Sequence, residues 1–228
     1  MNMLNKIRKS HPQKSTPKKL AFTFLALLAG FGLAILTELF SGMSARVLPQ
    51  WLESVNIRNL FATLMPWALG TLIISLFSRT PIRAAINVFT FSCGLILGCC
   101  VYLGVLVHIL PDWSHLSYIV ILTAISPLIA AVCWYGRGVG TVAGFVAAFI
   151  LAYWFLQAFH FTPTFQGFGV NFIYGVLPLV FLAAAIGMLW RKPLQILFST
   201  IGGFLIAYIY ILLPFSIPYV LVGSYLIL

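Results

Sequence analysis

The side chains that could perform chemistry in this 228-residue chain are few, and acids are the scarcest. Three Asp and Glu residues and four His stand against thirteen Lys and Arg. General acid–base catalysis needs carboxylates or imidazoles positioned at the reacting atoms. The sequence has no pair of acids within one apolar run, no H-E-x-x-H, no G-x-S-x-G and no P-loop. We therefore expect no enzyme and no cofactor.

Five polar residues stand near the ends of apolar runs and form a candidate polar cluster at the outer face: Glu38, His108, Asp112, His115 and His160. Imidazole and carboxylate groups together could bind a cation or a metal in an outer vestibule. The alternative, which we favour, is that these residues contact water and lipid headgroups, so no metal site is predicted. Glu38 stands at the membrane boundary, where a charge is costly. It serves either a transport path or a structural pairing with Arg46 or Arg58.

Composition indicates which elements must position these residues. The chain is 62% hydrophobic and 7% charged, whereas soluble domains carry about 25% charged residues. This excludes an ordinary soluble domain, a disordered chain and, despite the net charge of +10, a nucleic-acid reader. About 20 apolar residues cross a bilayer as a helix. Seven apolar runs are predicted to do so: 21–38 (a retained signal anchor), 59–78, 85–109, 117–135, 139–158, 171–190 and 194–213.

The predicted fold class is all-α: a polytopic transmembrane helix bundle of about seven spans, built largely from helical hairpins. A short apolar C-terminal segment follows Pro214. We expect a basic cytoplasmic tail over 1–20, drawn to anionic lipid, and a single transmembrane helical domain over 21–228. Apolar residues recur on one face after Pro49, which predicts an outer interfacial helix at about 47–57 with Trp51 at headgroup depth.

The positions of the charges predict how the chain is threaded. Eleven of the thirteen basic residues fall in the N-terminal tail or in the second, fourth and sixth connections, whereas all three acids fall on the opposite side. Lys and Arg are retained in the cytoplasm during insertion. The N-terminus is therefore predicted to be cytoplasmic, with His160 facing outward.

Small residues recur at every fourth position along three of the runs. Such stripes allow helix backbones to approach closely, because lipid supplies no hydrophobic force between helices. We expect them to mark the packed centre of the bundle, at Ala26, Gly30 and Ala34 in the first run, Gly94 and Gly98 in the third, and Gly136, Gly140, Gly144, Ala148 and Ala152 in or just before the fifth.

The chain also shows signs of an internal repeat. Pro66, Arg79 and Pro81 recur 112 residues later as Pro178, Arg191 and Pro193, and the tripeptide AGF occurs at 29–31 and 143–145. Internal repeats are common in transporter folds. The alternative is that any bundle of hairpins with basic inner turns shows this pattern.

The stretches SRTPIRAAINVFTFSCGLILG (78–98) and SPLIAAVCWYGRGVG (126–140) resemble a family of small bacterial multi-pass integral membrane proteins of uncharacterised function. The resemblance covers the middle third of the chain. It implies a bacterial inner or plasma membrane and supplies no activity, ligand or catalytic residue.

Two classes of function remain. The first is a transport-related protein, either a small permease or a membrane subunit that captures a substrate for a larger transporter. The second is a non-transporting membrane partner, such as an assembly or immunity protein that acts through helix contacts with other membrane subunits. A cavity with converging polar groups would favour the first class, and a solid core with an exposed small-residue groove would favour the second.

Overall fold

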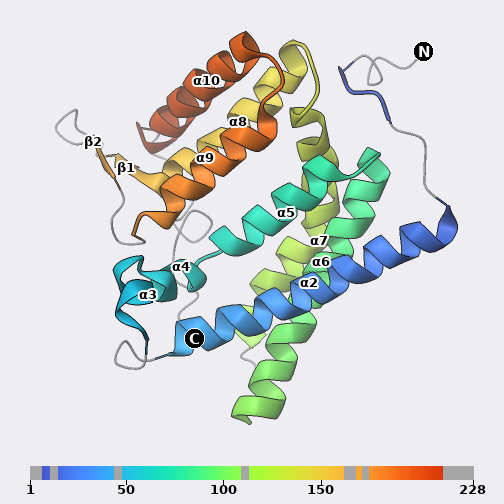
Figure 1. Cartoon of the computed structure of the whole chain (residues 1–228), viewed down its shortest axis with the longest axis vertical. Coiled ribbons are helices and arrows are strands. Elements are labelled where there is room, and N and C mark those ends of the chain that lie inside the picture. The colour runs from blue at the N-terminus through green and yellow to red at the C-terminus, as the bar shows by residue number, and fades with distance from the viewer. Residues whose placement is uncertain are drawn as a thin grey trace. The chain divides into compact units, whose positions relative to one another are not determined.

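The computed structural model describes residues 7–10, 15–43, 48–108, 113–161, 168–170 and 175–212 (Figure 1). Helices dominate this part of the chain. The elements are α2 (Thr16–Gly42), α3 (Gln50–Ser54), α4 (Ile57–Phe61), α5 (Met65–Phe77), α6 (Pro81–Val101), the π-helical η1 (Tyr102–Val107), α7 (Trp113–Gly136), α8 (Thr141–Ala158), β1 (Phe159–Phe161), β2 (Phe168–Val170), α9 (Leu177–Leu189) and α10 (Pro193–Leu212).

Each of the seven predicted apolar runs contains a helix, but the helices differ in length. Within the described residues, five are long and apolar enough to cross a membrane: α2, α6 with η1, α7, α8 and α10. The apolar helices α5 and α9 have 13 residues each, which gives about 20 Å at 1.5 Å per residue. The all-α membrane fold is supported, whereas seven full spans remain a prediction.

The chain divides into two compact units. The α2 unit comprises Lys9–Gly42 and Pro66–Trp134, and the α8 unit comprises Met1–Arg8, Met43–Met65 and Tyr135–Leu228. Each unit contains a long helix, a short helix and another long helix in that order: α2, α5 and α6 in one, and α8, α9 and α10 in the other. In both units the first and third of these helices share the most extensive contact.

Glycines set the contact between α2 and α6. A Cβ atom at Gly30 would collide with the backbone carbonyl of Phe91, and one at Gly94 would collide with that of Leu27. At Gly98 it would lie 2.6 Å from the carbonyl oxygen of Phe31. The backbones of the two helices therefore approach as closely as small residues allow. Two alanines of the same stripe, Ala26 and Ala34, are buried.

The corresponding contact between α8 and α10 is less tight at Gly144, near the start of α8. A Cβ at Gly144 would meet only Ser199 Oγ within 4 Å, at 3.7 Å, while one at Gly203 would lie 2.9 Å from the carbonyl oxygen of Ala148. Ser199 Oγ donates to the Gly144 carbonyl at 3.1 Å. At Gly144 the α8 unit thus has a side-chain hydrogen bond between its helices, whereas at Gly30 and Gly94 the α2 unit has direct contact between helix backbones.

The remaining stripe positions differ in surroundings. A Cβ at Gly136 would meet the side chains of Ile150, Val146 and Leu189 at 3.0–3.4 Å. Gly140 has open space around it and a φ of +96°, so it serves the turn before α8 rather than a helix contact. Ala148 and Ala152 are buried.

Two boundaries differ from the sequence predictions. Helix α2 begins at Thr16, so the basic residues Lys18 and Lys19 belong to a helix rather than to a tail. In place of one interfacial helix over 47–57, two short helices meet at Asn56, whose left-handed φ of 56° breaks the helical path. Trp51 is 68% exposed. The expected C-terminal segment beyond residue 213 lies outside the described residues.

Candidate functional site: a basic and apolar cleft in the α2 unit

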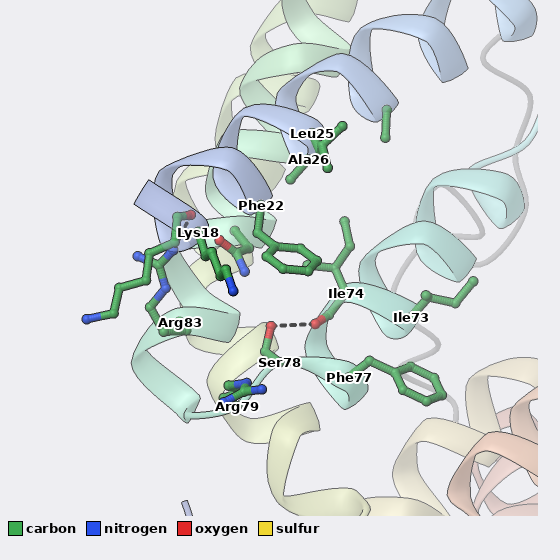
Figure 2. A pocket seen from close by; sticks show the side chains of 13 residues that line it. Lys18, Phe22, Leu25, Ala26, Ile73, Ile74, Phe77, Ser78, Arg79 and Arg83 are labelled. Atoms are coloured by element: carbon green, nitrogen blue, oxygen red, sulfur yellow. Dashed lines mark hydrogen bonds between the residues drawn. The ribbon is translucent and has the colours of Figure 1, made fainter. Parts of the chain in front are cut away.

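A cleft of about 400 Å³ lies in the α2 unit, between α2 on one side and α5, the following turn and the start of α6 on the other. Figure 2 shows Lys18, Arg79 and Arg83 near the turn, with Leu25 and Ala26 farther along α2. The lining residues are Lys18, Lys19, Phe22, Leu25, Ala26, Ala29, Ile73, Ile74, Phe77, Ser78, Arg79, Arg83 and Asn87.

The turn that carries the arginines is fixed by local sequence. Thr80 is the N-cap of α6 and its side chain accepts the backbone N–H of Arg83 at 3.2 Å, with Pro81 in the first helical turn. Both features favour a helix start. The hydroxyl of Ser78 donates to the Ile74 carbonyl at 2.6 Å. The indole of the buried Trp134 donates to the Ser78 carbonyl at 2.8 Å, which ties the turn to α7.

Arg83 is held in place across the cleft's base. Its Nη2 donates to the Lys19 carbonyl at 2.8 Å and to Thr23 Oγ1 at 2.9 Å. Thr23 Oγ1 in turn lies 2.9 Å from Oδ1 of Asn87, to which it donates. The guanidinium is therefore positioned by α2 rather than swinging freely in water, and its charge stays beside the cleft.

The other wall of the cleft is apolar and open. Phe22, Leu25, Ile73 and Phe77 all line it and are each more than two-fifths exposed. Exposed apolar side chains of this size are typical of a surface that meets lipid or another apolar partner. Four cations, and no acid among the described lining residues, stand beside this surface. The arrangement can hold a molecule that has an anionic group and an apolar chain.

The structure does not test the predicted outer polar cluster as a whole, because its members belong to two separate units and to residues that the structure does not describe. Glu38 and His108 belong to the α2 unit, and His160 belongs to the α8 unit. Asp112 and the side chain of His115 lie outside the described residues. His108 is exposed, with a left-handed φ of 58° just after η1, and His160 is exposed in β1 opposite Gly169. No three His, Cys, Asp or Glu residues among those described are grouped to hold a metal.

Glu38 is buried, with 7% of its surface exposed, and it contacts a thiol. Cys99 Sγ on α6 lies 3.5 Å from Glu38 Oε1 and donates to it. Of the two basic partners considered from the sequence, Arg46 lies outside the described residues and Arg58 belongs to the other unit. Next to Glu38, Thr37 Oγ1 accepts the indole N–H of Trp67 at 3.1 Å, which joins α2 to α5.

Sequence reasoning did not identify the cleft residues as a site. From the sequence alone, the four basic residues of the cleft predict only the orientation of the chain in the membrane. They do not predict that Lys18, Lys19, Arg79 and Arg83 lie close together. A usable signal was present: Arg79 and Arg83 bracket the start of one helix, four residues apart, and basic residues also begin the first span.

Comparisons with protein-family models, with curated proteins and with solved structures give no match. The function must therefore be argued from the geometry of the chain itself.

Proposed function

We propose that this integral membrane protein is transport-related, as a small permease or as a membrane subunit that captures a substrate. We further propose that its substrate is an anionic amphiphile held in the cleft of the α2 unit. The observation that carries the transport proposal is the long–short–long order of helices, which occurs once in each unit.

The correspondence between the units is close in length and spacing. The short helices α5 and α9 both have 13 residues and begin and end 112 residues apart, and α6 and α10 start with prolines at the same offset. In transporters, unusually short apolar segments at corresponding positions of two repeats point to the substrate site. Here α5 contributes three residues to the cleft: Ile73, Ile74 and Phe77.

Counting spans supports two units with the same orientation. Three crossings move a chain to the opposite face, so a second three-helix unit would start on the wrong side unless one further crossing intervened. Helix α7 supplies that crossing. Basic residues then stand on the cytoplasmic side at both equivalent turns, as Arg79 and Arg191. For α5 and α9 to cross, the backbone beyond their ends must be buried in protein or line a cavity.

The chemistry of the cleft favours the substrate class. Arginine guanidinium groups pair with phosphate or carboxylate through forked hydrogen bonds. The apolar wall formed by Phe22, Leu25 and Ile73 suits a hydrocarbon chain beside such a headgroup. The exposed apolar side chains of this wall would allow an amphiphile to enter the cleft from the bilayer.

The experiment uses the full chain reconstituted in vesicles that contain fluorescent NBD-phosphatidylglycerol or, as the neutral-headgroup control, NBD-phosphatidylcholine. Dithionite added outside bleaches the outer leaflet only, so bleaching beyond half of the label reports movement across the bilayer. We expect such movement for the anionic lipid and its loss in the double variant Arg79→Gln/Arg83→Gln. Arg58→Gln, an exposed arginine of the α8 unit, is the matched control.

The outcomes separate the forms of the proposal. Binding of phosphatidylglycerol without movement would overturn the permease and support the capturing subunit. Equal movement of the anionic and the zwitterionic lipid, or movement of the anionic lipid that survives loss of both arginines, would overturn the substrate class.

A further inference from the structure

A second group of cations lies in the α8 unit, at residues that the cleft does not use. The hydrogen bond from Val139 N to the Ile7 carbonyl, 2.9 Å long, fastens the N-terminal segment to the turn between α7 and α8. That bond brings Arg8 to the same turn as Arg137. From the turn before α10, Arg191 Nε donates to the Arg137 carbonyl at 3.2 Å. Three segments far apart in the sequence thus each bring one arginine to one place.

The three guanidinium groups are close enough to affect one another. Burial, followed by the charges of Arg137 and Arg191, lowers the pKa of Arg8 to about 10. Burial and the charge of Arg191 also lower the pKa of Arg137. Arg8 and Arg137 are partly buried and Arg191 is exposed. An anion among such cations reduces their mutual repulsion, and guanidinium forks match the oxygens of a phosphate group.

Backbone groups add to the positive potential of this cluster. Helix α8 begins at Thr141, directly after the turn, and has 18 residues. The first amides of a helix have no partner within the helix, and the helix dipole places partial positive charge there. Gln195 Nε2 donates to the Gly138 carbonyl at 3.2 Å and thereby holds the start of α10 against the same turn.

We propose that Arg8, Arg137 and Arg191 form a phosphate-binding site, separate from the cleft and independent of any transport. The phosphate is that of a lipid headgroup or of a soluble phosphate compound. Because Ile7 and Arg8 complete the site from the N-terminal segment, occupation would fasten that segment to the turn between α7 and α8.

The test uses the full-length protein in a neutral detergent. Thermal unfolding is followed while inorganic phosphate replaces chloride at constant ionic strength, and native mass spectrometry measures retention of phosphatidylglycerol against phosphatidylcholine. A ligand that binds the folded state raises Tm. A response to inorganic phosphate identifies a soluble source, and retention of phosphatidylglycerol alone identifies a lipid source. Either response supports this site only where the variants below reduce it and the cleft variant Arg79→Gln/Arg83→Gln does not.

Variants decide whether the three arginines carry the binding. We expect Arg137→Gln and Arg191→Gln each to weaken it about tenfold, as loss of a charge-assisted hydrogen bond does. Arg137→Lys, which keeps the charge without the fork, should fall between. Lys192→Gln removes an exposed neighbouring cation and should have no effect.

A charge-neutral variant tests the contribution of the N-terminal segment. A Cβ at Gly138 would lie 2.5 Å from the Ile7 carbonyl oxygen, so Gly138→Ala should displace Ile7 with Arg8 and weaken binding without removing a charge. Wild-type affinity in Arg137→Gln would overturn the proposal, because this arginine would then not bind phosphate. An equal loss in Lys192→Gln would also overturn it, because phosphate would then respond to net charge alone.

Discussion

The two three-helix sets of this protein share one order of helices but use their basic turns differently. In α2, α5 and α6, the third residue of the last helix is Arg83, which donates to the Lys19 carbonyl and borders an open cleft. In α8, α9 and α10 the matching residue is Gln195, which donates to the Gly138 carbonyl. In both units, the third residue of the third helix therefore donates a hydrogen bond to a backbone carbonyl at or just before the start of the first helix. The donor is charged in the α2 unit and neutral in the α8 unit.

Features that occur in both units are structural, and features that occur in one unit are candidates for function. This hydrogen bond, the short middle helix and the contact between first and third helices recur in both units, so they are structural. The open apolar wall beside four cations is described in the α2 unit, and the three-arginine cluster in the α8 unit. The cleft and the arginine cluster, each described in one unit, are therefore the candidate binding sites.

The largest expected effect concerns the side of the membrane on which the two basic turns lie. In a cysteine-free background, Arg79→Cys and Arg191→Cys should both be protected from a membrane-impermeant maleimide in intact cells, while Trp51→Cys should react. The reason is that basic turns stay in the cytoplasm. Labelling of one turn and not the other would show that the two units do not share an orientation; Arg137→Cys provides a third inner position.

The next effect concerns the glycine contacts. Gly94→Ala should destabilise the protein by about 1–3 kcal/mol, because its Cβ collides with the Leu27 backbone, which cannot move as a side chain can. Gly144→Ala is the matched change in the α8 unit, where there is room for a methyl group. It should be neutral or slightly stabilising, since Ala is the better helix former. Chemical denaturation in mixed micelles measures both, and equal losses would refute the difference in packing.

The sequence was sufficient for the long helices and insufficient for their ends. Hydropathy located a helix in all seven runs because burial in lipid needs long apolar segments. It merged α4 and α5 into one run, 59–78, since hydropathy does not register Thr63. The Thr63 hydroxyl donates to the Leu60 carbonyl at 2.7 Å and accepts Met65 N–H at 3.2 Å, which ends one helix and starts the next.

The candidate sites depended on tertiary structure and were missed for that reason. The cleft joins residues near 20 with residues near 80, and the arginine cluster joins residues near 8, 137 and 191. No local sequence pattern predicts contacts between residues so far apart in the chain. The 112-residue spacing, by contrast, is visible in three residue pairs of the sequence, and α5 and α9 follow the same offset.

A smaller effect is expected at the hydrogen bond that Arg83 donates to the Lys19 carbonyl. Arg83→Gln gives the α2 unit the residue type that the α8 unit has at this place, so the anchoring hydrogen bond can be kept while the charge is lost. Movement of phosphatidylglycerol in the dithionite assay should fall about tenfold, with little change in Tm. Gln195→Ala is the control, because it removes the equivalent hydrogen bond of the α8 unit without changing charge. A large loss of stability in Arg83→Gln would mean that the charge stabilises the fold.

The smallest expected effect is near the C-terminal end of α2, where Glu38 is buried beside the Cys99 thiol. When the AGF tripeptides at 29–31 and 143–145 are matched, the position that corresponds to Glu38 is Ala152, so the acid has no counterpart in the α8 unit. Glu38→Gln keeps the shape and an oxygen that can accept the thiol hydrogen, so unfolding free energy should change by no more than about 1 kcal/mol. Lipid movement should be unchanged, because the proposed anionic substrate binds at the basic end of the helix. Glu53→Gln, an exposed acid in α3, controls for loss of a negative charge. If Glu38→Gln stopped lipid movement at unchanged stability, the carboxylate itself would belong to the transport path, and the working site of the α2 unit would extend along the whole of α2.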